Sequence, residues 1–140
     1  GLGLTVAVQR IATRPGKPTW FGTIGGKGVL GLAGNPAAAM VCGHLFLRPL
    51  VHALLAREPD AASVAALLEG EVGDSGANEC YLRASLRSDA DARVRVRPFD
   101  TQDTSLVSIF AAANALIRRP AGAKAVASGA MVEVLLLDRS

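Results

Sequence analysis

The sequence predicts an α+β chain made of two parts. The first 57 residues contain strand-like runs followed by one long apolar helix, and after residue 58 the chain changes to short alternating strands. Half of the 140 residues are apolar but only 4% are aromatic, so Ala, Val and Leu must build the core. We therefore expect two domains, residues 1–57 and 58–140.

Composition excludes several classes of protein. The formal net charge of +3 is a mild excess, which suits a local anion site better than nucleic-acid binding. Cys42 and Cys80 belong to no CxxC or CxH spacing, so neither a disulfide framework nor a zinc site is expected. The most apolar segment, residues 37–56, contains Arg48 and Pro49, which argues against a membrane span. A cytoplasmic protein without nucleic-acid or membrane partners is predicted.

A basic turn follows the first predicted strand. Residues 4–8 read as a strand, and Arg14-Pro-Gly-Lys-Pro then forces a turn, because each proline fixes its φ and Gly16 accepts a positive φ. Arg14 and Lys17 are thereby held on a stiff loop, with Arg10 shortly before it. Guanidinium and ammonium groups together suit a tetrahedral oxyanion. The alternative is that these are three solvated surface cations.

Two strands and a helix start complete the first part. Residues 19–24 and 29–32 are strand-like and are joined by a glycine-rich segment at hairpin spacing. Asn35 is a favoured N-cap and Pro36 a favoured first helical residue, so a helix should begin there and run to residue 56.

This helix start is a candidate anion site. Its first amides lack helical partners, and Gly34 leaves room for a ligand to approach. The alternative is a simple cap. Pro49 should kink or restart the helix. Seven side chains can face the core: Met40, Val41, Leu45, Leu47, Leu50, Val51 and Leu54.

The second part begins with a polar turn, Glu58-Pro59-Asp60. Residues 80–86, 93–97 and 131–137 alternate as strands, and residues 104–116 have helical character with Leu106, Ile109, Phe110 and Ala113 on the apolar side. Arg93, Arg95 and Arg97 share one strand face without an interleaved aromatic residue, so an exposed face is favoured over a nucleic-acid-binding one. His44 and His52 have no third metal ligand at suitable spacing, and no catalytic acid, base or nucleophile can be assigned.

A series of motifs resembles the molybdopterin molybdenumtransferase family, which includes MoeA and the gephyrin E domain. The motifs are RPGKPTWFG, GKGVLGLAGNPAAAMVCGHLFLRPLVHALL, YLRASL, TQDTSLVSIFAAANALIRRP and SGAMVEVLLL. The resemblance covers nearly the whole chain. It implies the C-terminal part of a three-layer α/β molybdopterin-binding domain, followed by the family's small C-terminal β-barrel domain.

The resemblance also implies a function and a set of site residues. The function is insertion of molybdate into the dithiolene of molybdopterin, using adenylylated molybdopterin and Mg²⁺ and releasing AMP, in a cytoplasmic homodimer. The residues that match binding positions for molybdate or the molybdopterin phosphate are Arg10, Arg14, Lys17, Gly34, Asn35, Pro36, Arg83 and Thr104. The family's glycine-rich segment and acidic residue lie upstream of these motifs. The catalytic acid is therefore expected before Gly1, no metal ligand is expected in this fragment, and the fragment alone should be inactive.

Some positions depart from the family pattern. Arg14 replaces a Lys and Thr104 a Ser, which keeps the chemistry. Ala33 replaces a Pro, and Ala38 replaces a Ser whose hydroxyl could bind ligand. Two alternatives to the enzyme are considered: a non-catalytic scaffold of the same fold that docks a partner protein, and a plain anion-binding fragment.

Overall fold

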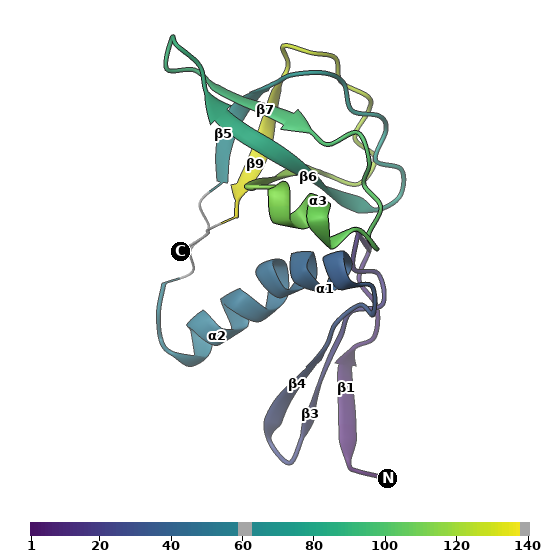
Figure 1. The fold of residues 1–140 in the computed structure, drawn as a ribbon. Coiled ribbons are helices and arrows are strands. Elements are labelled where there is room, and N and C mark those ends of the chain that lie inside the picture. Colours follow the sequence, from purple (N-terminus) through teal and green to yellow (C-terminus); the bar gives the residue numbers. More distant parts are fainter. Residues whose placement is uncertain (59–62, 138–140) are drawn as a thin grey trace.

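A computed structural model describes residues 1–58 and 63–137. Figure 1 shows the β-barrel at one end of the molecule, a small sheet at the other, and a helical run that passes beside the sheet and below the barrel. A short helix, α3 (Val107–Ala112), lies between the barrel and the helical run. This arrangement confirms the α+β class. The predicted turn at residues 58–60 falls partly on Pro59 and Asp60, which lie outside the described residues.

The small sheet has the strand order β1-β3-β4, with antiparallel pairing throughout. Strand β1 (Leu4–Val8) agrees with the prediction. Strands β3 (Trp20–Ile24) and β4 (Lys27–Gly31) form the expected hairpin, but their loop is only Gly25-Gly26 and β4 begins two residues earlier than predicted. Both loop glycines have positive φ, 53° and 77°, which is the conformation of the two-residue turns that match strand twist.

The helical run is continuous but changes its hydrogen-bonding pattern twice. It consists of α1 (Pro36–Cys42), a π-helical segment (Gly43–Leu47) and α2 (Arg48–Leu54). The predicted start at Pro36 is confirmed, with Asn35 in extended conformation before it. Pro49 lies in the first turn of α2, directly after the π-helical segment, and Leu47 and Arg48 keep helical dihedral angles, so the chain changes its hydrogen-bonding pattern before this proline and does not start a separate helix.

The predicted core face of this run is wrong at four of its seven positions. Val41 is fully buried, Leu45 packs against buried residues and Leu50 is half-buried, but Met40, Leu47, Val51 and Leu54 are exposed. The buried positions are at the beginning of the run, where α1 meets the barrel: Ala37, Ala38, Val41 and Cys42. By length and composition alone, the 19 residues Pro36–Leu54 would be long and apolar enough to cross a membrane. The buried first turns pack against protein in this structure.

Five strands close the barrel in the order β6-β7-β5-β9-β8, and β8 pairs back to β6. Their bounds are β5 Ser63–Leu68, β6 Glu79–Ser88, β7 Val94–Pro98, β8 Ala115–Arg119 and β9 Met131–Leu136. Among the pairings of these five strands in the described residues, only β5–β7 is parallel. The small interior holds aliphatic side chains from every strand, as predicted from the scarcity of aromatics: Ala66, Leu68, Val72, Ala84, Val96, Ala115, Ile117, Val132 and Val134.

The predicted helix at residues 104–116 is wrong at both ends. Its first residues form a turn, because Asp103 Oδ1 accepts from the backbone N of Ser105. Its last residues belong to β8. Between α3 and β8, the side chain of Asn114 bonds the backbone of Leu86 in both directions, at 2.6 and 2.9 Å. This amide extends the pairing with β6, and the helix therefore ends at Ala112.

The two parts of the molecule share a second apolar cluster. Val41 of α1, Ala113, Leu116 of β8 and Leu137 are its buried members, and Leu45, Tyr81, Phe99, Phe110 and Leu135 pack against it. His44 Nε2 also lies 3.1 Å from the carbonyl oxygen of Leu136. A second strand contact comes from β2 (Thr13–Arg14), which pairs in parallel with the start of β6. The first part is thus fixed to the outside of the barrel.

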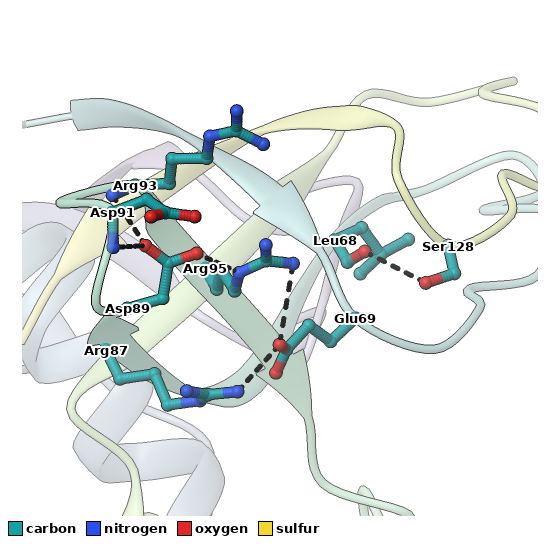
Figure 2. Close-up of polar contacts among 8 residues, drawn as sticks. All are labelled: Leu68, Glu69, Arg87, Asp89, Asp91, Arg93, Arg95 and Ser128. Atoms are coloured by element: carbon teal, nitrogen blue, oxygen red, sulfur yellow. Dashed lines mark hydrogen bonds and ion pairs between the residues drawn. The ribbon is translucent and has the colours of Figure 1, made fainter.

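Of the three arginines that alternate along β7 and the residue before it, Arg93, Arg95 and Arg97, the middle one forms ion pairs. Arg95 Nε contacts Asp89 Oδ2 at 2.5 Å, and the guanidinium lies 3.8 Å from Glu69, which also bonds Arg87 at 2.8 Å (Figure 2). These contacts lower the pKa of the Asp89 carboxyl, chiefly through the hydrogen bond from Arg95. Arg93 and Arg97 are exposed, as predicted for this strand face.

Candidate functional site

A polar cavity of about 650 Å³ lies at the junction of the two parts. Three segments that are distant in sequence form most of its wall: the basic loop (residues 13–18), the start of α1 (residues 33–35 and 38) and the loop before α3 (residues 102–104). The lining residues are 13–18, 33–35, 38, 78 and 102–104. Two cations and a carboxylate are among them, and no cysteine or histidine occurs among the described lining residues. The cavity therefore suits binding of an anionic ligand rather than thiol or imidazole chemistry.

The basic loop is held in place from both sides. Thr13 and Arg14 pair with Glu79 and Cys80 of β6, and the backbone N of Glu79 donates to the carbonyl oxygen of Ala12 at 2.8 Å. The loop then turns at Gly16, whose carbonyl accepts from the backbone N of Thr19 at 2.8 Å. These bonds fix the backbone that carries Arg14 and Lys17, in agreement with the stiff loop expected from the two prolines.

Gly16 has both a conformational and a steric reason to be glycine. Its φ is 116°, a region that residues with a side chain rarely adopt. A Cβ at this position would lie 2.6 Å from Cys42 Sγ, which is itself fully buried in α1. The basic loop thus packs directly on the helix whose first residues line the opposite wall.

The start of α1 is bound to the barrel through Thr104. The backbone N of Ala37 donates to the carbonyl oxygen of Thr104 at 3.1 Å, and Asn35 Nδ2 donates to Thr104 Oγ1 at 3.0 Å. Asn35 makes no side-chain cap. The backbone amide of Ala37, which the sequence suggested as a ligand donor, is thus hydrogen-bonded within the protein. The carbonyl and hydroxyl oxygens of Thr104 lie between the helix and the barrel.

The loop before α3 contributes the third wall. Gln102 Oε1 accepts from the backbone N of Arg83 at 2.9 Å, and Gln102 Nε2 donates to the carbonyl oxygens of Arg83 at 2.9 Å and Phe99 at 3.0 Å. Arg83 Nη1 donates to the carbonyl oxygen of Asp103 at 2.9 Å. Burial lowers the pKa of the Arg83 guanidinium, although Asp103 opposes this shift.

The Asp103 carboxylate is stabilised in its ionised form. Ser105 donates to Oδ1 from its backbone N at 2.9 Å and from Oγ at 2.8 Å, and these bonds hold the pKa of the carboxyl below its usual value. A lowered pKa stabilises the fold above the unfolded-state pKa of about 3.9, and this contribution is lost as the pH falls through the folded value.

We therefore expect Ser105→Ala to raise the pKa of Asp103 toward its ordinary value, because one of the two donors from Ser105 is removed. Carboxyl-carbon NMR titration of the chain measures this shift. Ser128→Ala, which removes a hydroxyl that bonds Leu68 in a barrel loop, is the control and should leave the Asp103 titration unchanged. An unchanged titration in Ser105→Ala would contradict the assignment.

The structure brings together most of the residues selected from the sequence. Arg14, Lys17, Gly34, Asn35 and Thr104 line the cavity, whereas Arg10, Pro36 and Arg83 are not among its described lining residues. Pro36 is instead the first residue of α1, Arg10 is exposed, and Arg83 is only 2% exposed.

Sequence reasoning missed four polar lining residues: Thr13, Asn78, Gln102 and Asp103. The polar run TQDTS was the available signal, since Asp followed by Ser two residues later is typical of a side-chain turn.

No metal centre is formed by the described residues. Within 1–58 and 63–137, no group of three His, Cys, Asp or Glu side chains is placed to hold an ion. Cys42 and Cys80 are free and buried. Asp103 is the carboxylate that the described cavity wall offers, which is too few for a Mg²⁺ site made by protein alone.

The barrel and the attached helical part make this an α+β protein with a cavity at their junction that Arg14 and Lys17 line. Residues 53–137 match the model of the MoeA C-terminal region (domain IV). The chain therefore belongs to the MoeA family, which confirms the resemblance seen in the sequence.

Curated relatives match nearly the whole chain. It is 30% identical over 137 residues to the molybdopterin molybdenumtransferase of Bacillus subtilis, covering 97% of this chain and 32% of the relative. It is 31% identical over 137 residues to molybdopterin molybdenumtransferase 1 of Mycobacterium tuberculosis, covering 93% of this chain and 32% of that one. The chain spans about a third of the length of these relatives.

Solved structures agree with this assignment. The molybdopterin biosynthesis MoeA protein from Pyrococcus horikosii superposes with a TM-score of 0.83 at 30% identity, covering 99% of this chain and 33% of that one. A molybdenum cofactor biosynthesis protein from Pyrococcus furiosus has a TM-score of 0.79 at 22% identity, covering 96% of this chain and 46% of that one, and shows the shared fold. The predicted combination of α/β part and small β-barrel is confirmed.

Proposed function

We propose that this chain is the C-terminal part of an enzyme of molybdenum cofactor biosynthesis that transfers molybdate to molybdopterin. The names of the curated relatives support the pathway and the substrates. The observation that carries the proposal is the cavity at the junction, in which Arg14 and Lys17 lie on a fixed loop opposite the Gly34-Asn35 start of α1.

The chemistry of the cavity fits these substrates. Molybdate and the molybdopterin phosphate are both tetrahedral oxyanions, which a guanidinium binds through paired donors and an ammonium through a point charge. Because the backbone under Arg14 and Lys17 is already ordered, binding costs little loop entropy. We also propose the domain division at residue 57, which would place the cavity between the two domains.

The finer points of the proposal come from the family resemblance. They are adenylylated molybdopterin as the form used, Mg²⁺ as cofactor, a homodimer, a cytoplasmic location and a catalytic acid supplied by sequence before Gly1. For Mg²⁺, the described residues of this chain do not form a site, so we assign no step to the ion here. The ligand contacts of Arg14, Lys17, Gly34, Asn35 and Thr104 are likewise part of the proposal.

The test is the double variant Arg14→Ala with Lys17→Ala. A charge-assisted hydrogen bond contributes about 1.5 to 3 kcal/mol, so loss of two should weaken molybdate binding about 100-fold or more. Calorimetry with sodium molybdate measures the loss of affinity in the chain. Complementation of a strain lacking the molybdenumtransferase tests whether the full-length variant still supports cofactor synthesis.

The matched control is Arg93→Ala with Arg97→Ala, which removes the same charge from two exposed positions, one just before β7 and one within it. It should bind molybdate within about twofold of the unchanged chain, because screened surface charges contribute little. Full binding and complementation by the Arg14/Lys17 variant would refute the proposal. A full-length protein that binds neither molybdate nor molybdopterin, yet pulls down a partner protein, would favour the scaffold alternative.

A further inference from the structure

Arg83 is the largest fully buried side chain of the molecule's described part, and it carries a charge. It lies on β6, with its side chain 2% exposed, and the structure records a hydrogen bond from Nη1 to the carbonyl oxygen of Asp103 at 2.9 Å. Burying a guanidinium is costly unless its hydrogen bonds are valuable to the structure. Such a residue therefore calls for a specific role.

The main chain of Arg83 is bound by the same loop. Phe99 N donates to the Arg83 carbonyl oxygen at 3.1 Å, and the Gln102 side chain bonds both the N and the O of Arg83. The Gln102 amide thus makes the two backbone hydrogen bonds that a paired strand would otherwise make with Arg83. Arg83 consequently holds residues 99–103 through its backbone on one side and through its guanidinium on the other.

The next residue of this loop reaches the other half of the molecule. Thr104 accepts from Ala37 N and from Asn35 Nδ2, at the start of α1. Hydrogen bonds join Arg83 to Gln102 and Asp103, the chain continues directly to Thr104, and Thr104 is hydrogen-bonded to the helix start. We call residues 102–104 the latch, because they line the cavity and bind both parts.

We infer that Arg83 is a positioning residue, which acts on the ligand through the latch by fixing Gln102–Thr104 against α1 and so setting the distance between the cavity walls. This differs from the direct ligand contact that the family resemblance implied for Arg83. The effect on ligand binding rests on the proposed function, whereas the effect on the latch does not.

A double-mutant cycle separates the two roles. Arg83→Met removes the donor, and Gln102→Leu removes the amide that bonds the Arg83 backbone. If both act through the latch, each should weaken molybdate binding about 10-fold, and the double variant should be little worse than the stronger single variant. If Arg83 contacts the anion itself, Gln102→Leu should have little effect or the two effects should multiply, which would overturn the inference.

A second readout needs no ligand. Amide hydrogen exchange at Ala37 reports its bond to Thr104, and we expect exchange to be about 10-fold faster in both single variants. Arg83→Lys keeps a donor and should recover most of the protection. Arg97→Met, on the neighbouring β7 strand opposite Ser85, makes the same type of change at an exposed site and should alter neither readout.

The outcomes remain distinguishable from failure of the proposed function. If the unchanged chain does not bind molybdate but Ala37 exchange responds as expected, the latch stands and the proposed function fails. If Arg83→Met does not fold, Arg83→Lys and Gln102→Leu still decide the matter through the same exchange measurement. Unchanged Ala37 exchange in Gln102→Leu would overturn the inference.

Discussion

Gly16→Ala is expected to destabilise the protein by about 2 to 6 kcal/mol and to displace the basic loop. The new Cβ would lie 2.6 Å from Cys42 Sγ in a fully buried part of α1, and the backbone would have to keep a φ of 116°. Forced backbone conformations and overpacking each cost about 1 to 3 kcal/mol. Because Arg14 and Lys17 flank Gly16, molybdate affinity should fall together with stability. Urea denaturation and calorimetry measure the two effects.

Gly43→Ala is the matched control for this variant. Gly43 has helical dihedral angles, φ −58° and ψ −44°, and a Cβ there would meet nothing within 4 Å beyond its chain neighbours and the backbone of its own helix. Alanine in a compatible helical position stabilises by about 0.4 to 1 kcal/mol, mostly by restricting the unfolded chain. The two glycine variants should therefore shift stability in opposite directions. Equal stability of Gly16→Ala and the unchanged chain would contradict the close packing of the loop on α1.

Leu116→Ala is expected to cost about 2 to 5 kcal/mol, which is the usual range for truncating a fully buried leucine. Leu116 is 0% exposed and belongs to the cluster that joins β8 to α1 through Val41. Its loss should therefore weaken the junction as well as the barrel. Denaturant unfolding followed at Trp20, in the small sheet, and by far-UV circular dichroism should show both parts losing stability together.

Leu54→Ala is the control for this truncation, because Leu54 is 77% exposed at the end of α2. Truncating an exposed leucine should change stability by no more than about 0.5 kcal/mol. A similar loss of stability in both leucine variants would mean that the apolar cluster does not carry the junction. A separate early transition at Trp20 in Leu116→Ala would instead mean that the two parts unfold independently.

Features set by local chemistry were predictable from the sequence. Two prolines and a glycine define the basic loop, and Asn35-Pro36 defines the helix start, without help from distant residues. The alternation of apolar residues likewise located β1, β6, β7 and β9. The family motifs then linked Thr104 to the same site, although nothing in its local sequence indicated that it lies near Asn35.

Features set by distant contacts were not predictable in the same way. Residues 113–116 had acceptable helical spacing, but the bonds between Asn114 and Leu86 and the pairing of β8 with β6 favour an extended chain. Periodicity also overestimated the buried face of the helical run, since only its beginning meets the barrel. The role of Gln102 was hidden for a related reason, because its side chain bonds a residue 19 positions away.

The parallel pairing of β2 with β6 has a consequence for how this molecule folds. Thr13 pairs with Glu79, so this contact closes a loop of roughly 65 residues, and closure of so long a loop comes at an entropic cost that local turns avoid. The contact can form only when β6 is available as a template. The position of the basic loop therefore depends on a barrel strand that is distant in sequence, so loss of the start of β6 should release Arg14 and Lys17 from their place.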